Sequence, residues 1–194
     1  MTDIDMGTVP LFDVEAAEPA PAPVLSVVGP PPGPLFEVVV RGIPGPQGSK
    51  RHVGGGRMIE SSAKVKPWRE AVVWASVAAR TKIRGFTALT VPLRADMVFS
   101  FARPKGHMGT GRNAGLVRQS APPRPHVPPD LSKLARSTED ALTTAGVYRD
   151  DALIVDYGVL GKWYTTDRGR VPGVLDSPGC TIRLWAAEEP EAGR

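Results

Sequence analysis

The sequence predicts an α+β domain in which a mixed sheet of about four to five strands is covered by two main helices. Three short runs rich in hydrophobic residues, at residues 35–42, 91–103 and 180–186, indicate strands. In two longer stretches, which follow Pro67 and Asp130, hydrophobic residues recur at helical spacing and indicate amphipathic helices. A further strand is predicted directly after Asp151.

The composition separates an acidic tail from a basic body. Residues 1–34 carry five acidic residues and no Lys or Arg, and their run PAPAPVLSVVGPPPGP favours extended, solvated conformers. We therefore expect residues 1–34 to be a disordered tail, which serves as a tether or occupies a basic site as an acidic mimic of DNA. The domain is predicted at residues 35–188, and residues 189–194 are expected to be a frayed end.

The charge of the body is suited to a polyanionic partner. Outside the tail, 24 basic residues face 15 acidic ones, which gives a formal charge of +9. The single cysteine, Cys180, rules out an internal disulfide and suits a reducing compartment. Because no apolar run approaches about 18 residues, no membrane span is predicted. We expect a cytoplasmic protein.

Two basic segments near the start of the body are candidates for DNA contact. The glycine-rich loop after the first strand contains Lys50 and Arg51, and it either wraps a phosphate or forms a flexible basic hairpin. Lys64, Lys66 and Arg69 cluster at the start of the first helix, where the helix dipole disfavours cations. Phosphate contact would explain that placement, and a solvated helix start is the alternative.

A long basic loop follows the strand at residues 91–103, which we predict to be buried on one face only. A loop of this length in a compact domain is usually functional or disordered. We expect it to become ordered on a nucleic-acid backbone. From residue 103 to 126 the segment has no acidic residue, two His and five cations: Arg103, Lys105, Arg112, Arg118 and Arg124.

The second helix shows the clearest periodicity in the chain. Asp130 fits the N-cap position, and Gly146 fits the turn that ends the helix. The predicted apolar arc consists of Leu131, Leu134, Ala135, Thr138, Ala141, Leu142 and Ala145.

Two acids, Asp150 and Asp151, precede the next strand. Alternation predicts Asp151 on the same face as Leu153, Val155 and Tyr157, where an unpaired acid would be costly. The chain path would bring Asp151 near the helix start at Asp130. Two carboxylates that meet in a basic protein suggest a Mg²⁺ or Mn²⁺ site for phosphodiester hydrolysis. The alternative is an ordinary N-cap Asp and an unrelated pair of turn Asp residues.

The stretch at residues 128–164 resembles the RusA family of Holliday-junction resolvases, small endodeoxyribonucleases of phages and prophages. The run Asp140-Ala141-Leu142 matches the Asp-Ala-Leu of the family and fixes the register. In that register Asp130 falls on the first family Asp, Arg136 on the family Lys, and Asp150-Asp151 on the family Asp pair. The resemblance covers roughly residues 36–185. It departs at Ser132, where the family has its second Asp, and at Lys133, where it has Asn.

The resemblance implies a RusA-like fold and a divalent-metal nuclease that acts in DNA recombination and repair. It implies that Asp130 and Asp151, helped by Asp150, hold Mg²⁺, with Mn²⁺ as the other possible ion. Ser132 would hold a metal-bound water, and Lys133 and Arg136 would offset charge in the transition state. Other acids, among them Asp156 and Glu139, would have to replace the carboxylate that Ser132 lacks.

The implied partners are branched DNA and a second copy of the chain, because a four-way junction is two-fold symmetric and needs paired nicks. If the protein is phage-encoded, it would act in the cytoplasm of a bacterial host. The alternatives are a branched-DNA-binding protein with weakened catalysis, a nuclease for other branched or flapped DNA, and a basic structural protein. The residues expected to carry the DNA backbone are Lys50, Arg51, Lys64, Lys66, Arg69, Arg103, Lys105, Arg112, Arg118 and Lys162.

Overall fold

A four-stranded mixed sheet forms the centre of the domain. The computed structural model describes residues 33–48, 50–52, 58–60 and 65–188. The sheet contains β1 (Phe36–Arg41), β4 (Leu93–Phe101), β5 (Ile154–Tyr164) and β6 (Gly179–Ala186), in the order β1-β6-β4-β5. β4 pairs with β5 in parallel, whereas β6 pairs antiparallel with both β1 and β4. The predicted α+β class and mixed sheet are confirmed.

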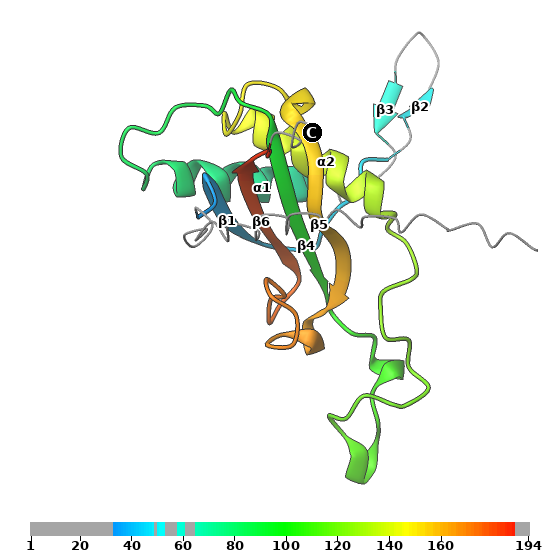
Figure 1. The fold of residues 1–194 in the computed structure, drawn as a ribbon. Helices are drawn as coiled ribbons and strands as arrows, with labels where there is room; N and C mark the ends of the chain where they lie inside the picture. Colours follow the sequence, from blue (N-terminus) through cyan, green and yellow to red (C-terminus); the bar gives the residue numbers. More distant parts are fainter. Residues whose placement is uncertain (1–32, 49, 53–57, 61–64, 189–194) are drawn as a thin grey trace, which may run out of the picture. The chain divides into compact units, whose positions relative to one another are not determined.

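Two helices, α1 (Val65–Arg80) and α2 (Leu131–Thr144), cover one face of this sheet (Figure 1). The core between them takes its side chains from alternate positions of β1, β4 and β6 and from the inner sides of both helices. The largest fully buried side chains are Trp68, Tyr148, Phe36, Phe99, Leu93, Met97, Leu134, Leu142, Ile182, Leu184, Val40 and Val72.

Polar contacts fix α1 against α2. The indole nitrogen of Trp68 donates to Thr138 Oγ1 at 3.1 Å, and both residues are almost fully buried. At the next position of α1, Arg69 Nη1 lies 3.4 Å from Asp140 Oδ2, and both of these side chains are partly buried. The predicted amphipathic face of α2 is confirmed, and the small side chain of Ser137 is also buried in it.

Strand β4 is buried on both faces, so the prediction of a half-buried strand is wrong. The face away from the helices is covered by the loop that connects β5 to β6. Val98 packs there with Trp163 and Val174, and Leu175 N donates to Ser100 Oγ at 2.9 Å. An irregular loop thus completes a second, smaller hydrophobic cluster.

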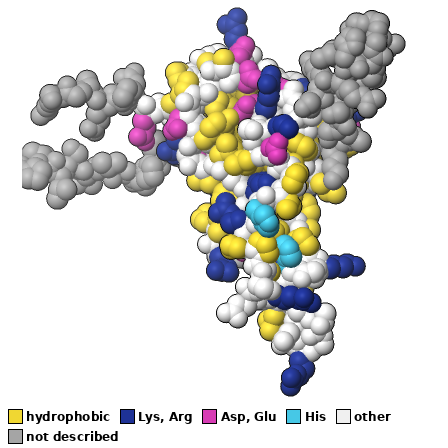
Figure 2. Space-filling model, turned by 90° about the vertical axis from the view of Figure 1, so that its right-hand side faces the viewer, with side chains coloured by type: hydrophobic (Ala, Val, Ile, Leu, Met, Phe, Trp, Pro, Cys, Tyr) yellow, Lys and Arg dark blue, Asp and Glu magenta, His cyan; other side chains and the backbone are white. Residues whose placement is uncertain are grey.

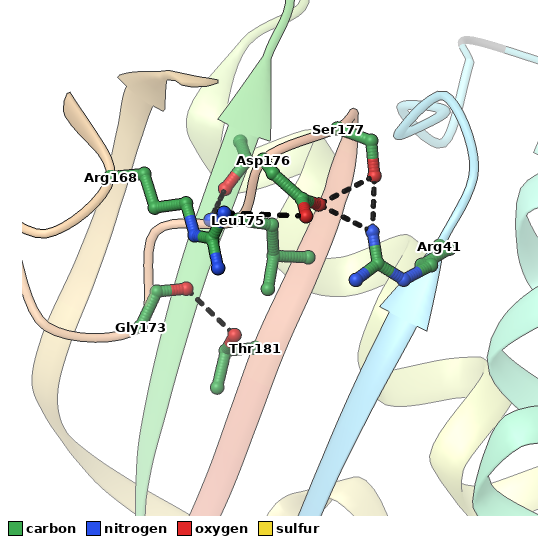
Figure 3. Close-up of polar contacts among 8 residues, drawn as sticks. Arg41, Arg168, Gly173, Leu175, Asp176, Ser177 and Thr181 are labelled. Carbon is green, nitrogen blue, oxygen red and sulfur yellow. Dashed lines mark hydrogen bonds and ion pairs between the residues drawn. The ribbon is translucent and has the colours of Figure 1, made fainter. Parts of the chain in front are cut away.

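The β5–β6 loop is held to the sheet by the polar contacts in Figure 3. Asp176 accepts from Arg41 at the end of β1 at 2.6 Å and forms a longer ion pair with Arg168 at 3.6 Å. Thr181 Oγ1 donates to Gly173 O at 2.7 Å. Because the loop is anchored at both sides, it can serve as a fixed cover for the outer face of β4.

Between α2 and β5, one feature of the chain agrees with the prediction and another does not. α2 ends as predicted at Gly146, whose φ of 66° suits glycine and whose N–H donates to Thr143 O at 2.9 Å. The strand prediction after Asp151 needs correction, because Asp151–Leu153 forms a 3-10 turn and β5 begins at Ile154. The Asp150 carboxylate accepts from Ala152 N at 2.9 Å, which stabilises this turn.

β5 is an edge strand, and its first half is exposed on both sides. Val155, Tyr157 and Val159 are 61%, 38% and 40% exposed, so the face predicted to be apolar and inward points largely to solvent. The correction has a topological cause, since β4 borders β5 on one side only and α2 covers it incompletely. Asp151 therefore does not lie on a buried strand face.

A separate two-stranded hairpin consists of β2 (Lys50–His52) and β3 (Met58–Glu60), paired antiparallel. It agrees with the hairpin alternative for this basic segment. The predicted tail at residues 1–34 falls almost entirely outside the described residues, as does the predicted frayed end at residues 189–194. Within the described part of the chain, no helix is long and apolar enough to cross a membrane.

The buried bond between the two helices leads to a stability prediction. Thr138→Val keeps the shape of the side chain but leaves the indole N–H of Trp68 without an acceptor, which costs about 1–3 kcal/mol. We expect urea unfolding, followed by fluorescence, to show that loss in the free energy of unfolding. Thr144→Val, an exposed position on the same helix, should change stability by less than about 0.5 kcal/mol. Equal effects at the two positions would contradict this role of the buried bond.

Candidate active site

The first turn of α2 places an acid among cations. Asp130 occupies the N-cap position as predicted, but its carboxylate makes no capping bond to the helix backbone. Asp130 Oδ2 instead lies 2.9 Å from Lys133 Nζ. The hydrogen bond and charge of Lys133 lower the pKa of Asp130, and the charge of Lys162 lowers it further. The carboxylate is therefore ionised and exposed at neutral pH.

Lys162, from the second half of β5, holds the chain just before α2. Its ammonium donates to Val127 O and Pro129 O, both at 2.9 Å. Partial burial lowers the pKa of Lys162, while the charge of Asp130 opposes that shift. The predicted phosphate contact of Lys162 remains a prediction, and the structure gives this side chain a positioning task beside Asp130.

The other candidate residues of this turn face solvent. Ser132, Lys133 and Arg136 are exposed on α2, so their side chains are accessible to a substrate. Gln47 N donates to Lys133 O at 2.9 Å, which joins the segment after β1 to the start of α2. No sequence pattern indicates that backbone contact, because 86 positions separate the two residues.

Farther along α2, an acidic cluster surrounds Glu139. The Tyr157 hydroxyl donates to the Glu139 carboxylate, and the Tyr148 hydroxyl donates to Glu139 O at 3.0 Å. Burial raises the pKa of Glu139, and the negative charges of Asp151 and Asp140 raise it further. Burial and the contact with Glu139 likewise raise the pKa of Tyr157, with a smaller contribution from Asp151.

The two predicted metal ligands thus lie in different electrostatic surroundings. Asp130 is next to two lysines, whereas the exposed Asp151 contributes to the negative field at Glu139 and Tyr157. Asp150 is engaged with Ala152 N through one carboxylate oxygen. The convergence of Asp130 and Asp151 on one ion stays a prediction.

The donor chemistry of these residues fits a hard divalent cation. Mg²⁺ is commonly bound through one or two carboxylates, with water and substrate phosphate as its other ligands. Among the described residues, no three or more His, Cys, Asp or Glu side chains are grouped so that they could hold a metal ion. The predicted metal site therefore stays a prediction.

The predicted DNA-binding residues divide into engaged and free groups. Arg69 pairs with Asp140, and the guanidinium groups of Arg103 and Arg118 bond to protein oxygens. Lys66 Nζ lies 4.0 Å from Glu70 Oε1, and an exposed ion pair of this kind contributes little to stability. Lys105 and Arg112 are exposed, and neither forms an ion pair within the described part of the chain.

The structure does not describe the side chains of three other residues of that set. Lys50 and Arg51 belong to β2, where the structure describes the backbone only, and Lys64 lies outside the described residues. Their predicted contact with DNA therefore stays a prediction.

The raised pKa of Glu139 leads to a pH-dependent stability. Because the folded protein favours the protonated carboxyl, the free energy of unfolding should fall as pH rises from the ordinary pKa of Glu through the raised one. Glu139→Gln removes this titration and keeps an oxygen acceptor for Tyr157. We expect the stability of this variant relative to wild type to increase over that interval and then to level off.

Urea unfolding at pH values from about 4 to about 8 would measure the difference. Glu70→Gln, on the exposed side of α1, controls for the loss of one negative charge. If the two variants show the same pH dependence, burial of Glu139 is not its cause.

The chain matches a known protein family over much of its length. The family described as Endodeoxyribonuclease RusA matches residues 41–172, which are 132 of the 194 residues. The match includes α1, β4, α2, β5 and the segment that joins β4 to α2. A search of curated proteins found no match to this chain. Resolvases of the RusA family act on branched DNA and depend on a divalent metal ion. The chain belongs to the RusA family of endodeoxyribonucleases, the Holliday-junction resolvases.

Proposed function

We propose that this endodeoxyribonuclease resolves four-way DNA junctions by Mg²⁺-dependent, paired hydrolysis of phosphodiester bonds in DNA recombination and repair. The observation that carries the proposal is the exposed first turn of α2. In that turn the ionised Asp130 pairs with Lys133, and the charge of Lys162 also lowers the pKa of Asp130. The chain that carries this turn belongs to the RusA family. In metal-assisted hydrolysis an acid can hold the metal ion, and nearby cations can bind the phosphate.

In this mechanism Asp130 and Asp151 would hold the ion, and Asp150 would assist them. The bound metal ion would supply a nucleophilic water and neutralise charge on the phosphate. Lys133 balances the charge of Asp130 in the free protein, and its flexible ammonium can turn toward a substrate phosphate. The guanidinium of Arg136 would offset the charge that develops in the transition state, but it cannot donate a proton at neutral pH.

Ser132 supports a second candidate function. The hydroxyl is exposed in the first turn of α2, where it would orient a water but supplies no negative charge. With one carboxylate fewer, the metal would be held more weakly. The alternative is therefore a protein that binds branched DNA with little or no cleavage. A nuclease for flapped or otherwise branched DNA remains the other alternative within the same chemistry.

We propose further that the protein acts as a homodimer, formed through the exposed first half of β5. An edge strand with unpaired backbone groups is a template for pairing with another strand. Val155, Tyr157 and Val159 add apolar surface to this edge. A second copy is the suitable partner, because the two equivalent nicks of a junction require two equivalent sites.

Measuring the molar mass of the protein in solution tests the proposed dimer directly. Light scattering should give a dimer for the wild-type chain and a monomer for Val155→Lys, because a charge would be buried without a partner. Val39→Lys, an exposed position on β1 at the opposite edge of the sheet, is the matched control. A dimer that survives Val155→Lys would exclude the β5 edge as the interface.

Cleavage should depend on the carboxylate of Asp151. We expect Asp151→Asn to reduce the rate of nicking of a synthetic four-way junction in Mg²⁺ by roughly 100-fold or more, the scale of losing one electrostatic group in a catalytic site. Glu37→Gln on β1, an exposed acid paired with Arg183, should cleave at the wild-type rate. Labelled strands on a denaturing gel report the nicks. Equal rates for wild type and Asp151→Asn would remove Asp151 from the mechanism.

A further inference from the structure

We propose that residues 104–129, which we call the arm, form a preformed surface for the backbone of a DNA duplex. In this proposal Lys105 and Arg112 contact phosphates, and Arg103 and Arg124 are positioning residues that hold the arm on β5. The inference rests on the proposed function, because it assigns the contacts that place a branched DNA substrate relative to the start of α2.

The arm has a backbone framework of its own. Met108 and Val117 form an antiparallel bridge, and Gly109 N donates to Leu116 O at 2.8 Å. Arg118 Nε donates to Met108 O at 2.7 Å across the same turn. At Gly109 a Cβ atom would lie 2.3 Å from Asn113 O, so only glycine permits the close approach of the two limbs. Bonds within the arm thus define its backbone, and the expectation that this loop becomes ordered on nucleic acid stays a prediction.

The charge of the arm has one sign. Residues 104–129 contain no Asp or Glu, and Figure 2 shows Lys, Arg and His side chains along the lower part of the view. The Asp and Glu side chains visible in that view gather in the upper part. Lys105 and Arg112 are exposed at two 3-10 turns of the arm, Lys105–His107 and Gly111–Asn113. Cations that are exposed and free of acids are suited to phosphate groups.

Arg124 attaches the returning limb of the arm to β5. Its Nε donates to Lys162 O at 2.8 Å, and its guanidinium lies 4.2 Å from the centre of the Trp163 ring. β5 is the edge strand, so this bond covers a carbonyl on its open side. At Gly161 a Cβ atom would approach the Trp163 ring and Arg124 Nη2 to within 2.4 and 2.9 Å. The absence of a side chain at Gly161 thus makes room for the contact.

Arg103 attaches the outgoing limb at the same end of β5. Its Nε donates to Thr166 Oγ1 at 2.9 Å, and its Nη1 donates to Pro122 O at 3.0 Å, which links the two limbs. The guanidinium stacks 3.9 Å from the centre of the Tyr164 ring. His107 packs edge-on against the same ring, with the two ring centres 5.7 Å apart. These contacts make Arg103 a positioning residue for the arm in this proposal.

One residue, Lys162, holds both the end of the arm and the chain that leads into the first turn of α2. Lys162 Nζ bonds to Val127 O and Pro129 O, so the returning limb is fixed up to the residue before Asp130. A surface fixed in this way loses little conformational entropy when it binds a duplex. The phosphates that contact Lys105 and Arg112 would then set which phosphodiester bond reaches Asp130.

Salt-dependent binding tests the contact with DNA. Anisotropy of a labelled four-way junction, measured in EDTA to prevent cleavage, gives the slope of log affinity against log salt concentration. The double variant Lys105→Gln/Arg112→Gln should bind more weakly, with a slope smaller by roughly 0.9 for each phosphate that is no longer neutralised. The control Lys82→Gln/Arg84→Gln removes two exposed cations between α1 and β4 and should leave the slope unchanged. An unchanged slope in the arm variant, or an equal reduction in the control, would overturn the proposal.

A distance measurement tests the attachment of the arm. Spin labels at Thr110→Cys, on the arm, and Lys82→Cys, on the body, would be measured in full-length protein diluted with unlabelled chain. We expect one narrow distance in wild type and a broad distribution in Arg103→Gln/Arg124→Gln. A broad distribution without these substitutions would contradict a preformed surface. Because neither measurement requires cleavage, the arm can be confirmed even if the junction is not cut, and it can fail while Asp151-dependent nicking remains.

Discussion

The last three residues of β5 hold the two parts of the molecule that are proposed to contact DNA, the start of α2 and the arm. Lys162 fixes the chain that leads into α2, and Trp163 and Tyr164 provide the ring faces on which Arg124 and Arg103 stack. An edge strand would otherwise expose its backbone and invite unspecific pairing. Here its second half is covered by the arm, while its first half stays open. The arm, the start of α2 and the open edge are therefore positioned by one strand.

The distribution of charge along α2 is the basis for proposing metal binding and phosphate binding on one helix. Its exposed start combines Asp130 with Lys133, and its later turns carry Glu139 in an acidic environment shared with Asp151. The cations near Asp130 keep the carboxylate ionised, which a metal ligand requires. Of these cations, Lys133 is exposed to solvent, whereas Lys162 is partly buried and bonds to backbone oxygens. Ser132 adds no negative charge to this turn, so the charges of Lys133 and Lys162 predominate around Asp130.

The sequence predicts an element correctly where the residues that determine it are close together in the chain. The periodicity of α2 and its stop at Gly146 are predicted correctly, because both depend on residues within the helix or next to it. The burial of β4 on both faces is not predicted. Its second face is covered by the β5–β6 loop, in which Leu175 is 75 positions from its partner Ser100. The charge of Arg103 is visible in the sequence, but its stacking on the Tyr164 ring is not, because the two residues are far apart in the chain. The Glu139–Tyr157 contact is missed because the exposure of Tyr157 depends on the edge position of β5.

The most direct test of a junction-resolving nuclease compares two substrates of the same sequence, a synthetic four-way junction and a linear duplex. Each would be incubated with the wild-type protein in Mg²⁺ or in EDTA, and every strand would be mapped for cuts. The proposed function predicts nicks at equivalent positions on two opposing strands of the junction, only in Mg²⁺, with the duplex intact. An uncut junction, or equal cleavage of junction and duplex, would contradict this function.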